Sequence, residues 1–380
     1  MEPVLTADLH LLCPDKERLV REVREETSVI GAMGWGEVGR EKVTDVFVQY
    51  DHKGPVLTLT TSRGAVLRCS PEHQCFGRLN PLCRQHYLYL MERSSLGFRV
   101  GLSSDLNRDL FAMQNLKRDL FHQQEVIDRL WIVEATDSLI RASFLEKLCT
   151  FKYGLPNIPF SGRNLESDLP DELVLELFNR IDTPSRAHQL LMDWYMFEDC
   201  PHITLRLSGA QSGASNAVQF VIFGGGEKNR GKTHFTHLIR IDSAVELKRA
   251  EHQQFKRRMG SQGMWNLEVA RDDLEEAQLF VKTLSALDDL EVVRKIQLSK
   301  KAPFYILPAS HLKVGMSVPI MGAHGIEEDT VVSISVEDFQ GPLYDFRLPG
   351  LCNYIVGQWV VMAWQGNPAR MGGSPDEPRL

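Results

Sequence analysis

Long apolar runs are missing from this 380-residue chain. No stretch reaches the length of about 18 apolar residues that a membrane-spanning helix needs. The start, Met1-Glu2-Pro3, also lacks the basic and then apolar pattern of a secretory leader. From these absences we expect a soluble, cytoplasmic protein with no membrane partner.

A disulfide framework is also missing. The chain has 7 cysteines, an odd number, and they are scattered rather than regularly spaced, which indicates a reducing compartment. A formal net charge of −7 argues against a protein that coats nucleic acid, although a local basic face remains compatible with it. With 43% apolar and 24% charged residues, the chain is long enough for two or three globular domains.

Both ends of the chain are rich in short apolar stretches separated by turn residues. Residues 27–67 alternate in this way, with one predicted turn at Asp51–Gly54, and residues 331–361 do the same, with a predicted turn at Gln340–Pro342. Neither end has enough apolar surface for a core of its own. We therefore expect the two ends to pair into one compact β domain.

Four sequence blocks at these ends resemble those of a Hint domain, the self-splicing fold of inteins. They are Val4–Asp8, Ser70–His73, Tyr344–Phe346 and Asn353–Val361. The whole pattern is similar to inteins found inside bacterial DNA helicases. The resemblance implies an all-β domain that is split by an insert, and mobile inteins carry a homing nuclease at that place.

The resemblance also shows which splicing groups this chain lacks. Intein chemistry needs a Cys or Ser as first residue, a Thr/Ser-x-x-His pair, and a terminal His-Asn before Cys, Ser or Thr. Of these only Ser70 and His73 are retained, and the other aligned positions hold Val4, Met362, Ala363 and Trp364. We expect a splicing-inactive, free-standing descendant. The alternative for His73 is a histidine that simply completes a β core.

The first part of the insert resembles a GIY-YIG nuclease. Tyr87–Met91 and Gly97–Gly101 predict a hairpin, Ser104–Arg108 a helix, Arg129–Ala135 a strand, and Ala142–Glu146 has the family's Ala-x-x-Leu-Glu form in a further helix. The implied catalytic residues are Glu146, which would hold a single Mg²⁺ or Mn²⁺, and Tyr89, Arg99 and Arg108.

Arg99 stands where the family has its second tyrosine. An arginine can bind a phosphate but is a poor general base, so cleavage would need another group or a metal-bound water to form the nucleophile. The alternatives are that Tyr87 and Tyr89 are ordinary strand aromatics and that Glu146 is a solvated carboxylate on a helix.

The rest of the insert predicts two connecting helices, ending at Ile181 and Met196, and then a small α+β unit. In that unit we expect strands at 203–207, 218–223, 237–241, 265–269 and 292–298 and helices at 243–258 and 273–286. Basic residues near its turns and helix ends predict contacts with the phosphates of double-stranded DNA. They are Lys228, Arg230, Lys232, Lys256, Arg257 and Arg258. The alternative is that they form an ordinary solvated surface.

Two other motifs in the chain are typical of ligand sites. Gly226–Thr233 fits the phosphate-loop pattern, but residues 234–241 alternate like a strand where a nucleotide site needs a helix. We therefore predict a hairpin turn. A zinc site is also conceivable from ligand types that cluster over a short stretch, although their spacing is wrong for one: Cys69, His73, Cys75, Cys83 and His86.

The sequence thus predicts a mixed fold: an all-β Hint domain formed by both chain ends, interrupted by an α+β insert made of a GIY-YIG-like unit and a second small α+β unit. The predicted parts are 1–85 and 302–363 for the Hint halves, 86–160 for the nuclease-like unit, 161–200 for the connector, 201–301 for DNA recognition and 364–380 for a disordered tail. The predicted function is metal-dependent DNA binding or cleavage by a splicing-inactive, intein-like protein. The alternative is a non-enzymatic interaction scaffold, and the oligomeric state stays open.

Overall fold

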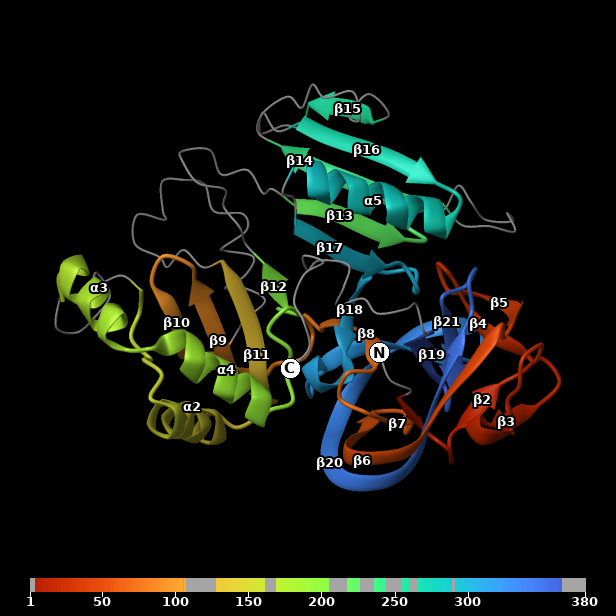
Figure 1. The fold of residues 1–380 in the computed structure, drawn as a ribbon, viewed down its shortest axis with the longest axis horizontal. Coiled ribbons are helices and arrows are strands. Elements are labelled where there is room, and N and C mark those ends of the chain that lie inside the picture. Colours follow the sequence, from red (N-terminus) through yellow and green to blue (C-terminus); the bar gives the residue numbers. More distant parts are fainter. Residues whose placement is uncertain are drawn as a thin grey trace. The chain divides into compact units, whose positions relative to one another are not determined.

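The computed structural model describes residues 4–104, 106, 128–160, 169–204, 217–225, 236–243, 255–259, 265–288 and 291–363. These residues form mainly β-structure with a few helices (Figure 1). The contacts divide the chain into two units. Unit 1 comprises Met1–Arg78, Leu207–Ala309 and Ser317–Leu380, and unit 2 comprises Leu79–Arg206 and Ser310–Met316.

Unit 1 contains the two chain ends and part of the insert. Its strands are β1 (Leu5–Thr6), β2 (His10–Leu12), β3 (Glu17–Leu19), β4 (Ser28–Gly34), β5 (Glu37–Lys42), β6 (Asp45–Thr61), β7 (Val66–Cys69), β8 (Gln74–Leu79), β13 (Ala217–Ile222), β14 (His237–Ser243), β15 (Lys256–Met259), β16 (Trp265–Arg271), β17 (Glu291–Ile296), β18 (Phe304–Pro308), β19 (Met316–Gly322), β20 (Gly325–Arg347), β21 (Asn353–Val356) and β22 (Trp359–Met362), with one α-helix, α5 (Leu274–Asp288), and a 3₁₀ turn at Val20–Glu22.

The expected pairing of the two chain ends is confirmed. Strand β6 from the N-terminal end pairs with β20 from the C-terminal end, from Thr61 opposite Val331 to Asp45 opposite Arg347. Two shorter contacts repeat the pattern, since β1 pairs with β20 and β8 pairs with β22. Each end supplies backbone hydrogen-bonding partners to the other.

Two predicted turns in this region are wrong. Asp51–Gly54 lies within β6 and Gln340–Pro342 lies within β20, and both strands continue through these positions as curved bands that run together (Figure 1). Gly341 pairs with His52, and the register shifts beside it. The turn-forming residues of the two strands face each other, so a bulge absorbs them and the ladder continues.

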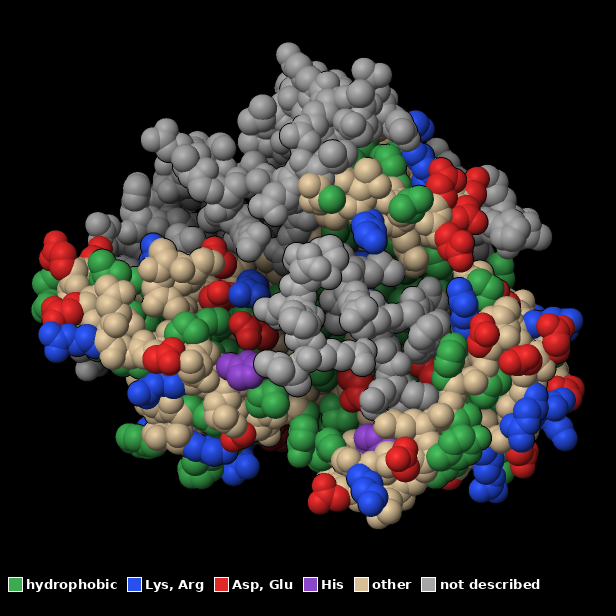
Figure 2. All heavy atoms as spheres, in the orientation of Figure 1, with side chains coloured by type: hydrophobic (Ala, Val, Ile, Leu, Met, Phe, Trp, Pro, Cys, Tyr) green, Lys and Arg blue, Asp and Glu red, His purple; other side chains and the backbone are tan. Residues whose placement is uncertain are grey.

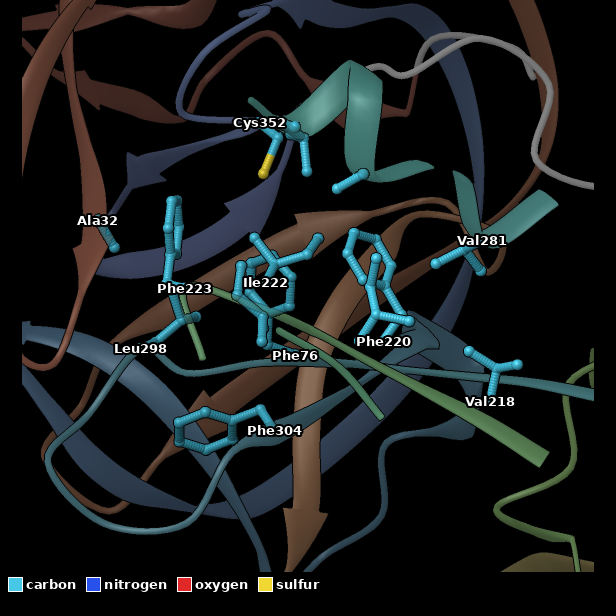
Figure 3. Close-up of a cluster of buried hydrophobic side chains, with 14 of the residues drawn as sticks. Ala32, Phe76, Val218, Phe220, Ile222, Phe223, Val281, Leu298, Phe304 and Cys352 are labelled. Atoms are coloured by element: carbon cyan, nitrogen blue, oxygen red, sulfur yellow. The ribbon is translucent and has the colours of Figure 1, made fainter. Parts of the chain in front are cut away.

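The insert part of unit 1 is built around β13. This strand pairs in parallel with β17 and antiparallel with β14, and its apolar residues Val218, Phe220 and Ile222 lie in a buried cluster that includes Val281 of α5 (Figure 3). The predicted helix at 243–258 is wrong at its end, because Lys256–Met259 form strand β15, which pairs with β16. Its edge position accommodates the polar run Lys256-Arg257-Arg258.

Unit 2 is a sheet in the order β10-β9-β11-β12, with helices against it. Its elements are β9 (His86–Arg93), β10 (Gly97–Ser103), β11 (Arg129–Thr136), β12 (Ile203–Thr204), α2 (Leu139–Tyr153), α3 (Asp171–Arg180) and α4 (Thr183–Asp193), with a 3₁₀ turn at Ala309–His311 on the border between the units. The predicted hairpin, strand, Glu146 helix and both connecting helices are confirmed. Of the predicted Ser104–Arg108 helix, residues 105, 107 and 108 lie outside the described residues.

One face of this sheet carries the core of unit 2. Leu88 and Leu90 of β9 pack with Leu145 and Cys149 of α2 and with helix α4. The N-terminus of α2 is capped by the side chain of Ser138, which accepts a hydrogen bond from the backbone of the first turn. Within the described ranges, no helix is both long and apolar enough to cross a membrane.

Candidate functional site

The first candidate site lies in unit 1, at the turn between β7 and β8. The Ser70 backbone N–H donates to the carbonyl oxygen of Val4 at 2.8 Å, and the His73 N–H donates to the carbonyl of Ser70 at 3.2 Å. Val4 is held on its other side, because its N–H donates to the carbonyl of Tyr344 at 3.1 Å. Four residues that the sequence assigned to splicing positions or blocks, Val4, Ser70, His73 and Tyr344, are therefore joined by backbone hydrogen bonds.

The C-terminal splicing positions converge on the same place. Val361 of β22 lies opposite Cys75 of β8 in an antiparallel ladder, and continuing this register by two residues sets Ala363 level with His73. Ala363 is buried, and its N–H donates to the carbonyl of Cys352 at 2.9 Å. Met362 pairs with Asn353. Trp364 lies outside the described residues.

The polar side chains of Ser70 and His73 are buried and uncharged. Ser70 is fully buried and His73 is 1% exposed, and burial lowers the pKa of His73 to about 3, so its imidazole is neutral at pH 7. Ser70 Oγ and His73 Nε2 have no hydrogen-bond partner within the described part of the chain. The valine and alanine side chains at positions 4 and 363 cannot attack a carbonyl or cyclise, so these two positions supply no bond-forming group.

The sequence analysis assigned no role to Asp345, which lies next to this site. Asp345 is 1% exposed, and its Oδ1 accepts hydrogen bonds from the Phe346 backbone N–H at 2.7 Å and from the Tyr354 hydroxyl at 3.0 Å. Burial, followed by the charge of Asp345, raises the pKa of Tyr354 well above its usual range. The Tyr-Asp-Phe block contained this signal, but only burial shows that the carboxylate belongs to the core.

The zinc alternative gains no support. Within the described ranges, no three His, Cys, Asp or Glu side chains form a group that could hold a metal ion. Cys69 and Cys75 are both fully buried, and burial, together with the neighbouring Cys75, raises the pKa of the Cys69 thiol well above its usual range. Thiols in this state are poor metal ligands, because the thiolate is the binding form.

The second candidate site lies in unit 2, on β9 and β10. Tyr89 pairs with Gly101, and a Cβ at Gly101 would stand 2.5 Å from the Tyr89 ring, so the ring covers the glycine. The Arg99 guanidinium lies over two rings, 6.0 Å from the Tyr89 centroid and 5.6 Å from that of Phe160. Arg99 is only 6% exposed, and its Nη1 donates to the carbonyl of Val100 at 3.1 Å. The predicted pair Tyr89 and Arg99 is thus in direct contact.

Glu146 lies on helix α2, on the other side of the sheet from this pair. The helix packs on the Leu88 face of the sheet, whereas Tyr89 lies on the other face, because side chains alternate along a strand. Glu146 is half-buried, and burial raises the pKa of its carboxyl, an effect that the charges of Arg99 and Lys147 oppose. The charge of Arg99 thus favours the ionised form of Glu146, although the sheet lies between their elements. Arg108, the fourth predicted residue, lies outside the described residues.

The predicted DNA-binding residues are only partly described. Lys256 is exposed on the edge strand β15, which also contains Arg257 and Arg258. Lys228, Arg230 and Lys232 lie outside the described residues, as does the phosphate-loop match at 226–233. The segment after that match forms strand β14 at His237–Ser243. A strand cannot aim the amides of a helix N-terminus at a phosphate, which agrees with the rejection of a nucleotide site.

Comparisons with known proteins give no family. No family model matches the chain, and no curated protein matches it. Among solved structures, the chain is similar to a DnaB intein from Synechocystis sp. PCC 6803, at 7% identity and a TM-score of 0.33, over 96% of this chain and 100% of that one. Two further similar structures are the Ssp DnaB mini-intein variant M86 (8% identity, 96% of each chain, TM-score 0.28) and its G-1F mutant (9% identity, 95% of this chain and 99% of that one, TM-score 0.28). TM-scores this low carry no argument, so the inferences below rest on the contacts of the chain itself.

Proposed function

We propose that this chain is a splicing-inactive, intein-like scaffold whose insert binds double-stranded DNA and cleaves it with the help of a divalent metal ion. The observation that carries the intein-like part is the convergence in unit 1. Val4, Ser70 and His73 are joined by hydrogen bonds, and the ladder sets Ala363 level with His73. These positions are remote in sequence, and the Hint alignment predicts that they meet.

Restoring the missing nucleophile tests this proposal. In Val4→Cys, the new thiol would attack the preceding carbonyl carbon, and the displaced amine would become the free N-terminus of residue 4. An added thiol such as dithiothreitol then attacks the resulting thioester, takes over its acyl group and sets the residue 4 thiol free. With a reporter protein fused before residue 1, we expect thiol-dependent release of the reporter from Val4→Cys and none from the unmodified chain.

Two matched variants make the result specific. Val4→Cys combined with His73→Ala should lose most of the release, because His73 belongs to the retained Ser70 and His73 pair that polarises the scissile amide. Val38→Cys, which places a cysteine at an exposed strand position of unit 1, should release nothing. A folded Val4→Cys protein that stays intact in thiol would contradict the Hint alignment.

The DNA part of the proposal rests on the resemblance of the segments around Tyr89, Arg99 and Glu146 to a GIY-YIG nuclease, and the charge of Arg99 favours the ionised Glu146 carboxylate. A single carboxylate fits Mg²⁺ or Mn²⁺ only when substrate phosphate oxygens and waters complete the coordination shell. Glu146 would hold the metal, which when bound supplies charge stabilisation at the scissile phosphate. Arg99, fixed over two aromatic rings, adds positive charge near this carboxylate and is not free to act as a mobile phosphate ligand.

This part is tested by incubating the purified chain with supercoiled plasmid and Mg²⁺ or Mn²⁺ at low and moderate salt, scoring nicking and gel retardation together. We expect nicking that Glu146→Ala removes and that Glu172→Ala, an exposed carboxylate of α3, retains. Retardation without nicking would leave DNA binding and remove cleavage. If neither occurs, the DNA part fails, while the result of Val4→Cys still stands by itself.

A second function is favoured by one specific observation. Helix α2 exposes five large apolar side chains to solvent, which a nuclease does not require and an interaction surface does. In this alternative the chain is a non-enzymatic scaffold that binds a protein partner. The absence of plasmid binding in the same assay would favour it.

A further inference from the structure

Helix α2 is apolar on two sides. Its inner side, with Ala142, Leu145 and Cys149, is buried. Its outer side carries four apolar residues with spacings of four, four and three, which places them along one stripe of a helix. We call this set the α2 stripe, and its exposed fractions are large: Ile140 85%, Phe144 51%, Leu148 42% and Phe151 83%.

The α2 stripe is a continuous surface. From Ile140 to Phe151 it runs for about 16 Å along the helix axis. Figure 2 shows hydrophobic and basic side chains gathered at the lower left, where Figure 1 draws α2. Single exposed apolar residues are common in soluble proteins, but an aligned set on one helix marks a binding surface for another apolar face.

The charges beside the α2 stripe decide what this face binds. Lys147 lies along one flank, and Arg141 and Lys152 lie along the other, at the angles that helical spacing sets. Arg141 lies 5.4 Å from the centroid of the Phe144 ring. Lys147 is exposed, whereas Lys152 already pairs with Asp193. The surface is therefore an apolar stripe between cations.

A second copy of the chain does not fit this surface. An antiparallel pair of α2 helices that faces Ile140 with Phe151 of the other copy also sets Arg141 beside Lys152 of that copy, so that like charges meet. The area is small as well, because the stripe offers roughly 400 Å² per side. A symmetric pair would bury less than the 1,200 Å² or so of a stable interface.

We infer that the α2 stripe is a docking surface for an amphipathic helix of a partner protein, with an apolar face between acidic flanks. Such a helix lays leucine-like side chains along Ile140, Phe144 and Phe151 and sets its carboxylates against Arg141 and Lys147. The limited area makes the complex transient, and the charges give it partner specificity. This inference goes beyond the proposed DNA function and does not depend on it.

The test uses two synthetic 15-residue helical peptides with the same leucine face, one with glutamates on both flanks and one with lysines. Each is labelled with fluorescein, and binding to the full chain is followed by fluorescence anisotropy at low and high salt. We expect the glutamate peptide to bind about tenfold more tightly at low salt, with the preference shrinking at high salt.

Variants separate the apolar from the charged contribution. Phe144→Ser with Phe151→Ser should abolish binding of the glutamate peptide, and Leu82→Ser, at a 90% exposed apolar residue outside α2, should leave it unchanged. Arg141→Glu with Lys147→Glu should reverse the preference toward the lysine peptide. Because these side chains are exposed, all variants should keep the circular dichroism spectrum and melting temperature of the parent chain.

Three results would overturn the inference. They are equal binding of both peptides, no binding of either, or a charge-swapped variant that keeps its preference for the glutamate peptide. Light scattering on the unmodified chain provides a further check, because a concentration-dependent dimer that Phe144→Ser with Phe151→Ser abolishes would assign the α2 stripe to a second copy instead.

Discussion

Two stacked histidines make unit 2 sensitive to acid. The Ile132 N–H donates to His202 Nδ1 at 3.0 Å, so the proton of that ring is on Nε2, which lies 2.8 Å from the carbonyl oxygen of His311. The Phe197 N–H donates to His311 Nε2 at 2.8 Å, and the two imidazole centroids are 5.2 Å apart. Both hydrogen-bond patterns require neutral imidazoles, because each ring uses one nitrogen as an acceptor.

The surroundings keep these rings neutral. Burial lowers the pKa of His202 to about 3, and burial followed by the neighbouring His202 and Lys313 lowers the pKa of His311 well below its usual range. The charge of Glu134 raises the pKa of Lys313. Protonation at either histidine would therefore break a hydrogen bond and add a charge beside other basic groups.

The sign of the pH effect follows from these lowered values. At a pH between its lowered folded-state pKa and the usual value of about 6.5, such a histidine binds a proton in the unfolded state but not in the folded state. The free energy of unfolding therefore falls as the pH falls through this range. For His202 the loss between pH 7 and pH 5 is about 2 kcal/mol, a large fraction of the stability of one unit. His311, whose pKa is lowered as well, adds a loss of the same sign.

Hydrogen exchange at the amides of Ile132 and Phe197 measures this loss directly, since both amides donate to the two rings. In His311→Gln the amide oxygen can accept the Phe197 hydrogen bond without titrating, so the opening free energy should lose about half as much between pH 7 and pH 5. The control is His324→Gln, at an exposed residue of unit 1. Equal pH dependence in His311→Gln and the unmodified chain would refute the assignment.

Three further predictions concern buried polar groups. Lys313→Met should raise the free energy of unfolding of unit 2 by about 2 kcal/mol at pH 7, as measured by urea unfolding. Burial lowers the pKa of Lys313 to about 8, and burying the charge costs more free energy than the hydrogen bond to the Ser310 carbonyl contributes. The stabilisation should vanish near pH 10.5, where the lysine of the unfolded chain also becomes neutral. Ser70→Ala should leave the melting temperature unchanged or raise it, because the hydroxyl is buried without a described partner; a clear destabilisation would show that it has one. Asn353→Ala should destabilise unit 1 by about 3 kcal/mol or more in the same urea assay. The Asn353 side-chain amide accepts a hydrogen bond from the Ala32 N–H and donates to the carbonyl oxygens of Ala32 and Leu351, and the substitution removes all three bonds. A loss below about 1 kcal/mol would contradict this.

The alternating pattern of the chain ends was enough to predict which segments pair. The prediction of turns was wrong at Gln340–Pro342 and Asp51–Gly54, because a turn is predicted from neighbouring residues whereas strand pairing depends on residues far apart in the sequence. Read alone, each segment has the composition of a turn. Their register places Gly341 opposite His52, and two irregular segments that face each other cost the ladder one bulge rather than an interruption.

The end of the predicted helix at 243–258 failed for a related reason. Lys256-Arg257-Arg258 has good intrinsic helix propensity. The pairing of β15 with β16, from Lys256 opposite Glu268 to Met259 opposite Trp265, outweighs it. Tertiary hydrogen bonds that a single sequence does not show decide such segments.

The two candidate sites differ in how much the sequence could reveal. The resemblance of the chain ends to the blocks of a Hint domain implied that Val4, Ser70 and His73 belong together. Spacing could not predict the relation of Tyr89 to Glu146, which depends on the face of the sheet against which α2 packs. That choice follows from the burial of Leu145 and Cys149 with Leu88, and the outer α2 stripe is equally apolar. A helix with two apolar sides leaves its own orientation ambiguous until tertiary contacts select one of them. The same orientation of α2 therefore sets both the position of Glu146 and the exposure of the α2 stripe. If the helix were turned so that the stripe faced the sheet, Glu146 would move away from its present position.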